Sequence, residues 1–312
     1  MILYDGTKWF YPLTRYAKLF QKSYNIKEQA KILSLLLIYS IACTLFFEYY
    51  TTGKKLIDPL YFSLVGVVLS LMLVFRLNTA YDRWYEGRKQ WGALVNTSRV
   101  IALVIDSILP EDNADDRKKA AMIVSAFPYL LKCHLRGETS EHWPAVVSDL
   151  KRDIQHKLPK HGPIAGAKLL QIFATKICDQ YNAPLEKRIA LQDNIKDLLN
   201  ITGACERILK TPIPFSHSFF IKMFTLLYVT AIPFGIFHFF GWYTILGTLA
   251  IGFALIGIEI ISESIEEPFG LHANDLPLTQ LSSNILHSVY DTLAVEMAEH
   301  LPDDQEDEWI IY

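Results

Sequence analysis

The chain has 312 residues, a formal net charge of −3 and 51% hydrophobic residues, with 18 Phe, 16 Tyr and 6 Trp. This composition and the positive mean hydropathy of +0.19 are typical of an integral membrane protein rather than of a soluble domain. The near-neutral charge does not favour nucleic acid as a partner. The cysteines are far apart and form no CxxC pair, which argues against a disulfide framework or a zinc motif: Cys43, Cys133, Cys178 and Cys205.

The first 31 residues form a basic arm and do not resemble a signal peptide. They contain no short apolar segment that ends in a small-residue cleavage site. Their positive charges are spread along the whole segment: Lys8, Arg15, Lys18, Lys22, Lys27 and Lys31. We therefore expect residues 1–31 to be a cytoplasmic N-terminal arm.

Two apolar segments follow within residues 32–75. Ile32–Phe47 ends just before the aromatic pair Tyr49-Tyr50, as at a membrane interface. Pro59–Phe75 contains no charged residue and stops at Arg76. Because a helix needs about 20 apolar residues to cross the hydrocarbon core, we expect these segments to be transmembrane helices one and two.

A longer apolar stretch lies near the end of the chain. Met223–Ile258 contains no Asp, Glu, Lys or Arg, and it is too long for a single crossing. Gly241, set among aromatic residues, predicts a hairpin at the headgroup level. Within residues 213–264 we therefore expect helix three at Ser218–Phe239 and helix four at Tyr243–Ser264.

The distribution of Lys and Arg indicates the orientation. Positive charges follow helix two, whereas the hairpin between helices three and four has none; only Lys54 and Lys55 in the first loop oppose this bias. Cytoplasmic loops carry the excess of Lys and Arg. We therefore expect a multi-pass protein of a bacterial inner membrane with both termini and residues 76–212 in the cytoplasm.

The region 76–212 has helical periodicity throughout. Helix two is expected to continue through Trp84–Leu109, because apolar residues recur there at intervals of three and four. Further helices are expected in this region at Asp115–Arg136, Ala145–Leu158, Ala165–Tyr181 and Pro184–Leu209. Residues 265–312 form a cytoplasmic C-terminal segment with an amphipathic stretch, Leu278–His300, and an acidic end. The predicted fold is an all-α membrane protein: four transmembrane helices and a helical cytoplasmic domain.

Signatures of catalysis are absent from the sequence. It contains no HExxH, GxSxG, P-loop or GxGxxG motif, so we expect neither an enzyme nor a cofactor. His156 and His161 are five residues apart, a poor spacing for one helix face, and are interpreted as surface histidines. Acidic residues fall on one face where helix four reaches the cytoplasm, and we interpret them as a solvated or ion-paired face: Glu259, Glu263, Glu266 and Glu267.

Two motifs resemble the bestrophin family, and its prokaryotic members most closely. The first is FRLNTAYDRWYEGRKQWGALVNTSR at Phe75–Arg99, where an aromatic-ended span leads into Arg83-Trp84. The second is Glu267-Pro268-Phe269-Gly270 followed by NDLPL at Asn274–Leu278. The order of two spans, a helical insert and a two-span hairpin also agrees, so the resemblance covers nearly the whole chain.

This resemblance implies a homopentamer around one central pore that passes small monovalent ions. Its partners are other copies of the chain, the permeant ions and membrane lipid. The family's apolar neck corresponds to Val67, Leu71 and Phe75, which share one face of helix two. Packing of this face against a neighbouring helix is the alternative. A second constriction, at the cytoplasmic aperture, aligns with Ile189 by its spacing from Cys205.

A metal site is not expected. Animal bestrophins bind calcium through a run of acids after Pro-Phe-Gly, whereas the matching run Leu271–Asp275 has a single carboxylate. Calcium requires about 6–8 oxygen ligands. Calcium gating is therefore not expected for this chain.

The sign of the permeant ion stays open at this point. Chloride is the family default, and a cation channel selective for sodium is the alternative. Arg76 would favour anions if it lined the lumen, and the acidic C-terminal end would favour cations if it lined the exit. A non-conducting scaffold and a membrane enzyme remain as other classes, and conductance in liposomes under asymmetric salt separates a channel from a scaffold.

Overall fold

A computed structural model describes residues 24–50, 59–138, 159–272 and 274–296, and every regular element in these ranges is helical. In chain order the elements are α3 (Tyr24–Tyr50), α4 (Pro59–Asp106), α5 (Ala114–Arg136), α7 (Gly162–Gln180), α8 (Leu185–Lys210), α9 (Phe215–Phe240), the 3-10 turn η2 (Gly241–Tyr243), α10 (Thr244–Glu266) and α11 (Leu278–Thr292).

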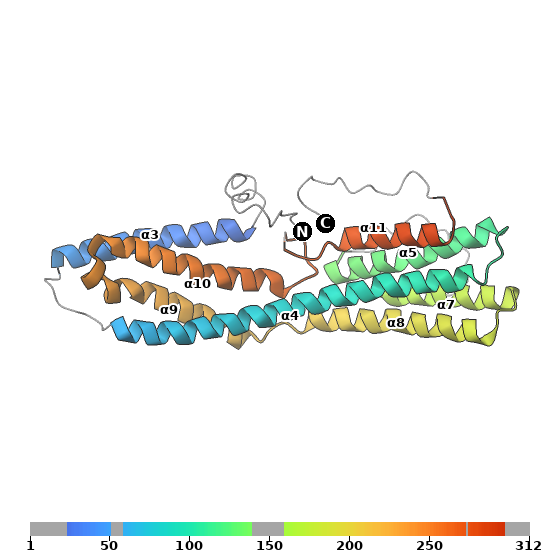
Figure 1. The fold of residues 1–312 in the computed structure, drawn as a ribbon, viewed down its shortest axis with the longest axis horizontal. Coiled ribbons are helices and arrows are strands. Elements are labelled where there is room, and N and C mark those ends of the chain that lie inside the picture. Colours follow the sequence, from blue (N-terminus) through green and yellow to red (C-terminus); the bar gives the residue numbers. More distant parts are fainter. Residues whose placement is uncertain (1–23, 51–58, 139–158, 273, 297–312) are drawn as a thin grey trace.

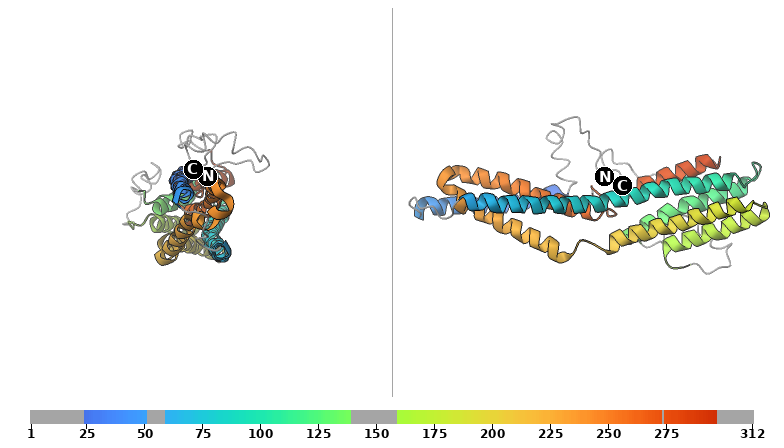
Figure 2. Two further views of the ribbon diagram at one scale, coloured as in Figure 1. Left: turned by 90° about the vertical axis from the view of Figure 1, so that its left-hand side faces the viewer. Right: turned by 60° about the horizontal axis from the view of Figure 1, so that its bottom comes forward.

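The helix α4 joins two bundles that lie end to end (Figure 1). It has 48 residues and is therefore about 72 Å long at 1.5 Å per residue. Its first half packs with α9 and α10, which in turn pack with α3, and its second half packs with α5, α8 and α11. The right-hand view of Figure 2 shows the same elongated arrangement, and the left-hand view looks along it from one end. The predicted continuation of helix two from the apolar segment into Trp84–Asp106 is thus confirmed.

The first bundle contains the apolar segments. Three stretches are long and apolar enough to cross a membrane, at Ile26–Tyr50, Leu60–Asp106 and Phe215–Glu266. The third stretch is broken by η2 into α9 and α10, which pack against each other as a hairpin. Gly241 has φ +50° and ψ −125°, a conformation that only glycine adopts readily. The hairpin predicted at Gly241 is therefore present.

Few side chains in the first bundle are buried by the chain itself. Its apolar core is a small cluster in which Leu69 and Leu73 of α4 meet residues of the other three helices: Leu36, Ile221, Val229, Leu255 and Ile256. Most of its remaining large apolar side chains are exposed. Apolar surface of this extent requires lipid or further protein to cover it.

The second bundle has a continuous core of its own. Trp91, Leu94 and Ile101 of α4 are fully buried against α5, α7, α8 and α11. Local signals set the ends of α5: the Asn113 side chain accepts a hydrogen bond from the backbone N–H of Asp116, and Gly137 ends the helix at φ +66°. This core fixes the direction of the second half of α4.

The predicted cytoplasmic helices correspond to α5, α7 and α8, with ends that differ by at most three residues. The predicted amphipathic stretch, Leu278–His300, contains α11 at Leu278–Thr292, and its last four residues lie outside the described residues. The expected helix at 145–158 and the acidic C-terminal end lie outside the described residues.

Candidate pore-lining face of α4

An apolar stripe runs along the outer face of α4. Val67, Leu71 and Phe75 are 70%, 55% and 60% exposed, whereas Leu69 and Leu73 on the opposite face are fully buried. Residues four apart lie on one side of a helix, so the three exposed side chains form a single line. Among the described helices of the chain, none covers this line.

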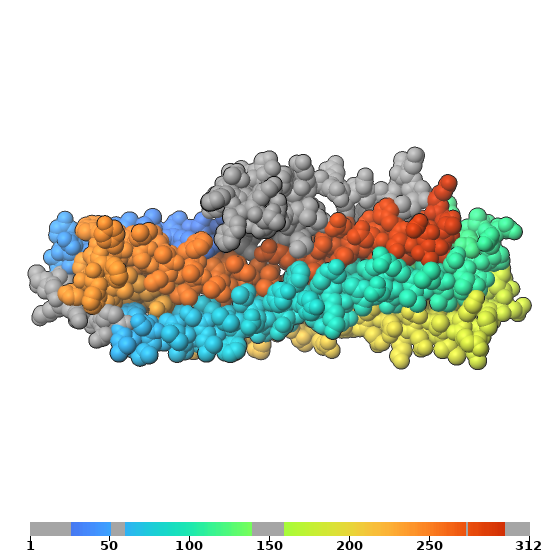
Figure 3. Space-filling model, in the orientation of Figure 1, coloured from blue at the N-terminus to red at the C-terminus, as the bar shows by residue number. Residues whose placement is uncertain are grey.

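Beyond Phe75, toward the C-terminal end of α4, the same exposed face carries polar side chains. Asn78, Asp82 and Lys89 lie on it beyond Phe75, and each of them is exposed, as is Tyr85 between them. In Figure 3 the surface of α4 stays uncovered by the other described helices along most of its length. One exposed face of α4 thus leads from an apolar segment to a segment that carries both polar and aromatic side chains.

Arg76 follows Phe75 directly and points to the opposite side of the helix. Its Nε donates to both carboxylate oxygens of Glu259 at 2.9 Å, and its Nη1 donates to Ser218 Oγ at 2.9 Å. Its Nη2 lies 3.4 Å from Glu266 Oε2. The guanidinium is only 1% exposed and is surrounded by α9 and α10.

This placement excludes the case in which Arg76 lies on the exposed face of α4, and it confirms the ion-paired interpretation of the acidic face. Arg76 lies inside the subunit and does not sit on the exposed face of α4, so it does not offer its charge there. The acidic face of α10 is ion-paired, with Glu259 and Glu266 on Arg76 and Glu263 on Lys222 at 2.7 Å. These ion pairs could not be predicted from local sequence patterns, because the paired residues are more than 40 positions apart in the chain.

The Arg83-Trp84 motif ties α4 to two chain connections. Arg83 donates to the carbonyls of Ile208 and Thr211, at 2.7 and 2.6 Å, where α8 ends. Its Nε donates to the carbonyl of Glu266 at 3.1 Å. Trp84 Nε1 donates to the carbonyl of Asn274 at 3.0 Å. Carbonyls at helix ends lack partners within the helix, so Arg83 satisfies groups that would otherwise be unpaired.

The predicted aperture residue, Ile189, lies in the first turns of α8. Its side chain is 48% exposed, on the outside of the second bundle. The nearby Arg188 is held inward by hydrogen bonds to the carbonyls of Ala183 and Cys178. The structure therefore leaves Ile189 available for contacts outside the chain.

The loop after Pro-Phe-Gly directs its single carboxylate inward. Asp275 is 2% exposed, and its Oδ2 accepts a hydrogen bond from the backbone N–H of His272 at 2.7 Å. Its Oδ1 has no hydrogen-bond partner within the described ranges. Burial raises the pKa of the Asp275 carboxyl above its ordinary value. A Cβ on Gly270 would lie 2.5 Å from Asp275 Oδ2, so the loop needs glycine there.

A cluster that the sequence did not predict lies in the second bundle. His134, His161 and Glu206 come together from α5, the start of α7 and α8. His161, interpreted as a surface histidine, has a side chain that is 29% exposed and hydrogen-bonded to Glu206; His156 lies outside the described residues. No local spacing could reveal a cluster drawn from three helices.

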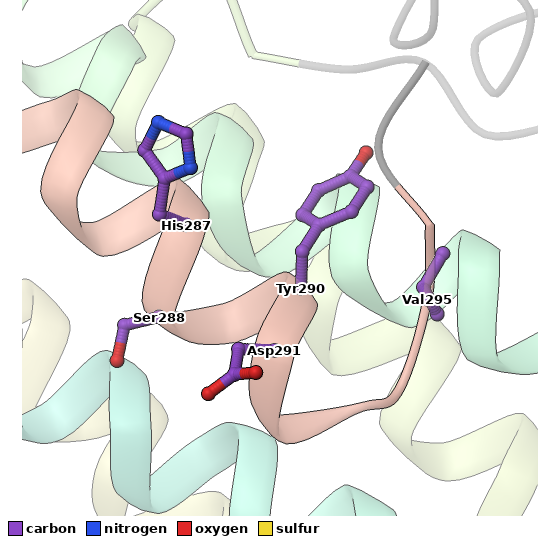
Figure 4. Close-up of a pocket in the computed structure, with 5 residues that line it drawn as sticks. All are labelled: His287, Ser288, Tyr290, Asp291 and Val295. Carbon is purple, nitrogen blue, oxygen red and sulfur yellow. The ribbon is translucent and has the colours of Figure 1, made fainter.

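An open surface depression lies on α11 near its end. Its lining consists of His287, Ser288, Tyr290, Asp291 and Val295 (Figure 4). In that view His287 and Tyr290 project from one side of the helix, whereas Ser288 and Asp291 project from the other. Ser288 Oγ already accepts a hydrogen bond from Arg99 Nε at 2.9 Å. The polar groups do not converge, which argues against a ligand site here.

Comparison with known proteins gives a consistent picture. A family profile described as Bacterial/Fungal Bestrophin protein matches residues 18–291. A voltage-dependent anion channel-forming protein of Nostoc sp. is 32% identical over 264 residues, which cover 80% of this chain and 84% of the relative. The protein of the same description from Synechocystis sp. is 34% identical over 248 residues, covering 77% and 80%.

The fold also matches a solved structure. A crystal structure of a bacterial bestrophin homologue from Klebsiella pneumoniae aligns with a TM-score of 0.73 at 23% identity. The alignment covers 85% of this chain and 98% of that chain. At this level of identity the likeness establishes the shared fold.

Proposed function

This chain belongs to the family of bacterial and fungal bestrophin proteins, and on that basis we propose that it is a membrane ion channel for small monovalent anions, with chloride as the principal ion. Relatives at 32% and 34% identity are described as voltage-dependent anion channel-forming proteins. The apolar segments of the first bundle provide the membrane part that such a function needs. No cofactor or catalytic residue takes part in the proposed activity.

The proposed topology has four crossings in a bacterial inner membrane. These are α3, the first half of α4, α9 and α10, since η2 divides the last apolar stretch into two helices of sufficient length. Both termini and the second bundle then lie in the cytoplasm, as the distribution of Lys and Arg favours.

The pore is proposed to form where α4 helices of five copies of the chain surround one axis. The exposed apolar line of Val67, Leu71 and Phe75 is the observation that carries this proposal. In a pentamer it forms three stacked apolar rings, about one helical turn apart. Such a constriction controls conduction by losing water, because its wall offers no hydrogen bonds. The polar face below Phe75 forms the wider cytoplasmic part, and Ile189 contributes the aperture.

A cation-selective channel, with sodium as the principal ion, is the second candidate. It is favoured by the position of Arg76, whose charge is buried against Glu259 and Glu266. Two carboxylates against one guanidinium leave this group with a formal charge of −1. The charge of Arg76 therefore does not supply an anion preference at the neck.

The experiment that tests the function is a recording from the purified full chain in planar bilayers with asymmetric KCl. An anion channel gives a reversal potential near the equilibrium potential of chloride, and a cation channel gives one near that of potassium. Assembled protein that is incorporated but carries no current would contradict the channel proposal and favour a scaffold. Bilayers without protein are the control.

A further inference from the structure

Three ligand-type side chains meet at one point of the cytoplasmic bundle. Nε2 of His134 lies 2.8 Å from Glu206 Oε1, and Nε2 of His161 lies 2.7 Å from the same oxygen. The two imidazole ring centroids are 4.1 Å apart. The three ligand atoms all lie within 4.8 Å of one another.

We propose that His134, His161 and Glu206 form a binding site for one divalent transition-metal ion, with Zn²⁺ as the best match. Two imidazole nitrogens and one carboxylate oxygen are an established donor set for zinc, with water as the fourth ligand. Mg²⁺ and Ca²⁺ prefer sites built from oxygen and fit this set poorly.

Small side-chain movements convert the present arrangement into a coordination shell. Zinc bonds of about 2.0–2.2 Å in a tetrahedron place the ligand atoms roughly 3.3–3.5 Å apart. The contact from each histidine Nε2 to Glu206 Oε1 must therefore lengthen by about half an ångström. The two Nε2 atoms must also come to lie roughly 3.3–3.5 Å from each other. We expect rotation of the three side chains to supply changes of this size.

Metal binding by His161 does not require its ring to lose a proton. Nδ1 of His161 accepts the backbone N–H of Ile164 at 3.5 Å, so in the absence of metal the ring carries its proton on Nε2 and donates it to Glu206. When Nε2 binds the metal, this proton resides on Nδ1 and no net proton leaves the neutral ring. This shift of the proton breaks the hydrogen bond from the backbone N–H of Ile164 to Nδ1 at the start of α7, which is weak at 3.5 Å.

The surroundings support a carboxylate that binds through one oxygen. Lys210 Nζ lies 3.2 Å from Glu206 Oε2, which leaves Oε1 for the metal. Outer contacts of this kind orient a ligating carboxylate. The side chains of His134, His161 and Glu206 are 25%, 29% and 21% exposed, so an ion can enter from solvent.

A hydrogen-bond cluster without metal is the rival explanation. Both imidazoles would then be neutral and donate from Nε2 to Glu206 Oε1, which gives both N–H groups an acceptor without an ion. Only the proposed site predicts saturable zinc binding, and it also predicts that zinc links α5, α7 and α8.

The test is isothermal titration of the metal-free full chain in detergent with ZnCl₂, and with MgCl₂ for comparison. We expect one Zn²⁺ per chain and no measurable Mg²⁺ binding. His134→Ala and His161→Ala should each weaken zinc binding at least tenfold, whereas His287→Ala, an exposed histidine on α11, should leave it unchanged. Zinc should also raise the Tm of the wild-type chain but not of His134→Ala.

A second measurement needs no variant. X-ray absorption at the zinc edge of the zinc-loaded wild-type chain should show nitrogen and oxygen neighbours together with the outer-shell signal of two imidazoles. The absence of zinc binding, binding that is undiminished in both histidine variants, or a spectrum without imidazole would overturn the proposal. If a variant fails to fold, the spectrum alone decides.

Discussion

Arg76 and Glu259 form a buried ion pair across α4 and α10, in which Arg76 Nε lies 2.9 Å from both carboxylate oxygens of Glu259. Because Arg76 follows Phe75 in the helix, this pair fixes the rotation of α4 about its own axis. The guanidinium of Arg76 points into the subunit, whereas the phenyl ring of Phe75 is exposed on the outer face of α4.

Breaking this pair should destabilise the subunit strongly. In Glu259→Gln the guanidinium of Arg76 loses its closest counter-charge and keeps only Glu266, at 3.4 Å, while it stays buried. Breaking a buried pair costs about 3–5 kcal/mol when the remaining charge has no other partner, so the retained Glu266 contact makes that range an upper bound here. We expect a clear drop in the Tm of the detergent-solubilised chain. Glu263→Gln is the matched control, because its pair with Lys222 is exposed and such pairs contribute about 0–1 kcal/mol. Equal Tm values for the two variants would contradict the structural role of the Arg76–Glu259 pair.

The buried carboxyl of Asp275 should make stability depend on pH. Its pKa is raised above the ordinary 3.8 by burial, so folding favours its protonated form. Its contribution is therefore fully present at low pH and is lost as pH rises through the folded pKa. Asp275→Asn keeps an acceptor for the N–H of His272 and does not titrate. We expect the Tm of Asp275→Asn relative to wild type to increase from pH 4 to pH 7, and a constant difference would show that Asp275 does not titrate in this way.

The topology can be tested with reporter fusions. We expect reporters inserted near Pro163, at the start of α7, and fused after Tyr312 to report the cytoplasm, because Lys and Arg concentrate on that side. A reporter inserted after Trp242, in the hairpin turn, should report the periplasm and serves as the opposite control. A periplasmic signal at either of the first two positions would refute the four-crossing topology.

If Ile189 forms the cytoplasmic aperture, a smaller side chain at this position should change the ion preference of the channel. If Ile189 of five subunits faces the axis, Ile189→Ala widens the exit and should change the permeability ratio among anions while the protein remains assembled. Leu209→Ala is the control, since Leu209 is also exposed on α8 but lies roughly 200° around the helix from Ile189. Permeability ratios that are equal in both variants and the wild type would remove Ile189 from the aperture.

The sequence predicts those features that depend on local patterns. Helical periodicity placed α4, α5, α7 and α8 to within a few residues, and Gly241 identified the hairpin turn because its backbone conformation requires glycine. Pairings between distant segments were not predictable in this way. The partners of Arg76 lie on α9 and α10, and the cluster around Glu206 draws on three helices, so only the tertiary packing brings them together.

The apolar line on α4 carries the central claim, that this face is the barrier of the pore. The decisive variant converts Val67, Leu71 and Phe75 together to Ala. A narrow apolar ring strips an ion of its water without replacing it, so smaller side chains should lower the barrier. Converting Leu69 and Leu73 to Ala is the matched control, because these side chains are fully buried inside the subunit and each loss should cost about 2–5 kcal/mol.

The measurement is bilayer recording paired with size-exclusion chromatography on the same purified sample. If these residues form the pore barrier, the Val67, Leu71 and Phe75 variant elutes as the intact oligomer and carries a larger current than the wild type. The Leu69 and Leu73 variant instead loses stability or assembly. For the first variant, an intact oligomer with wild-type current, or a dissociated protein, would contradict this account.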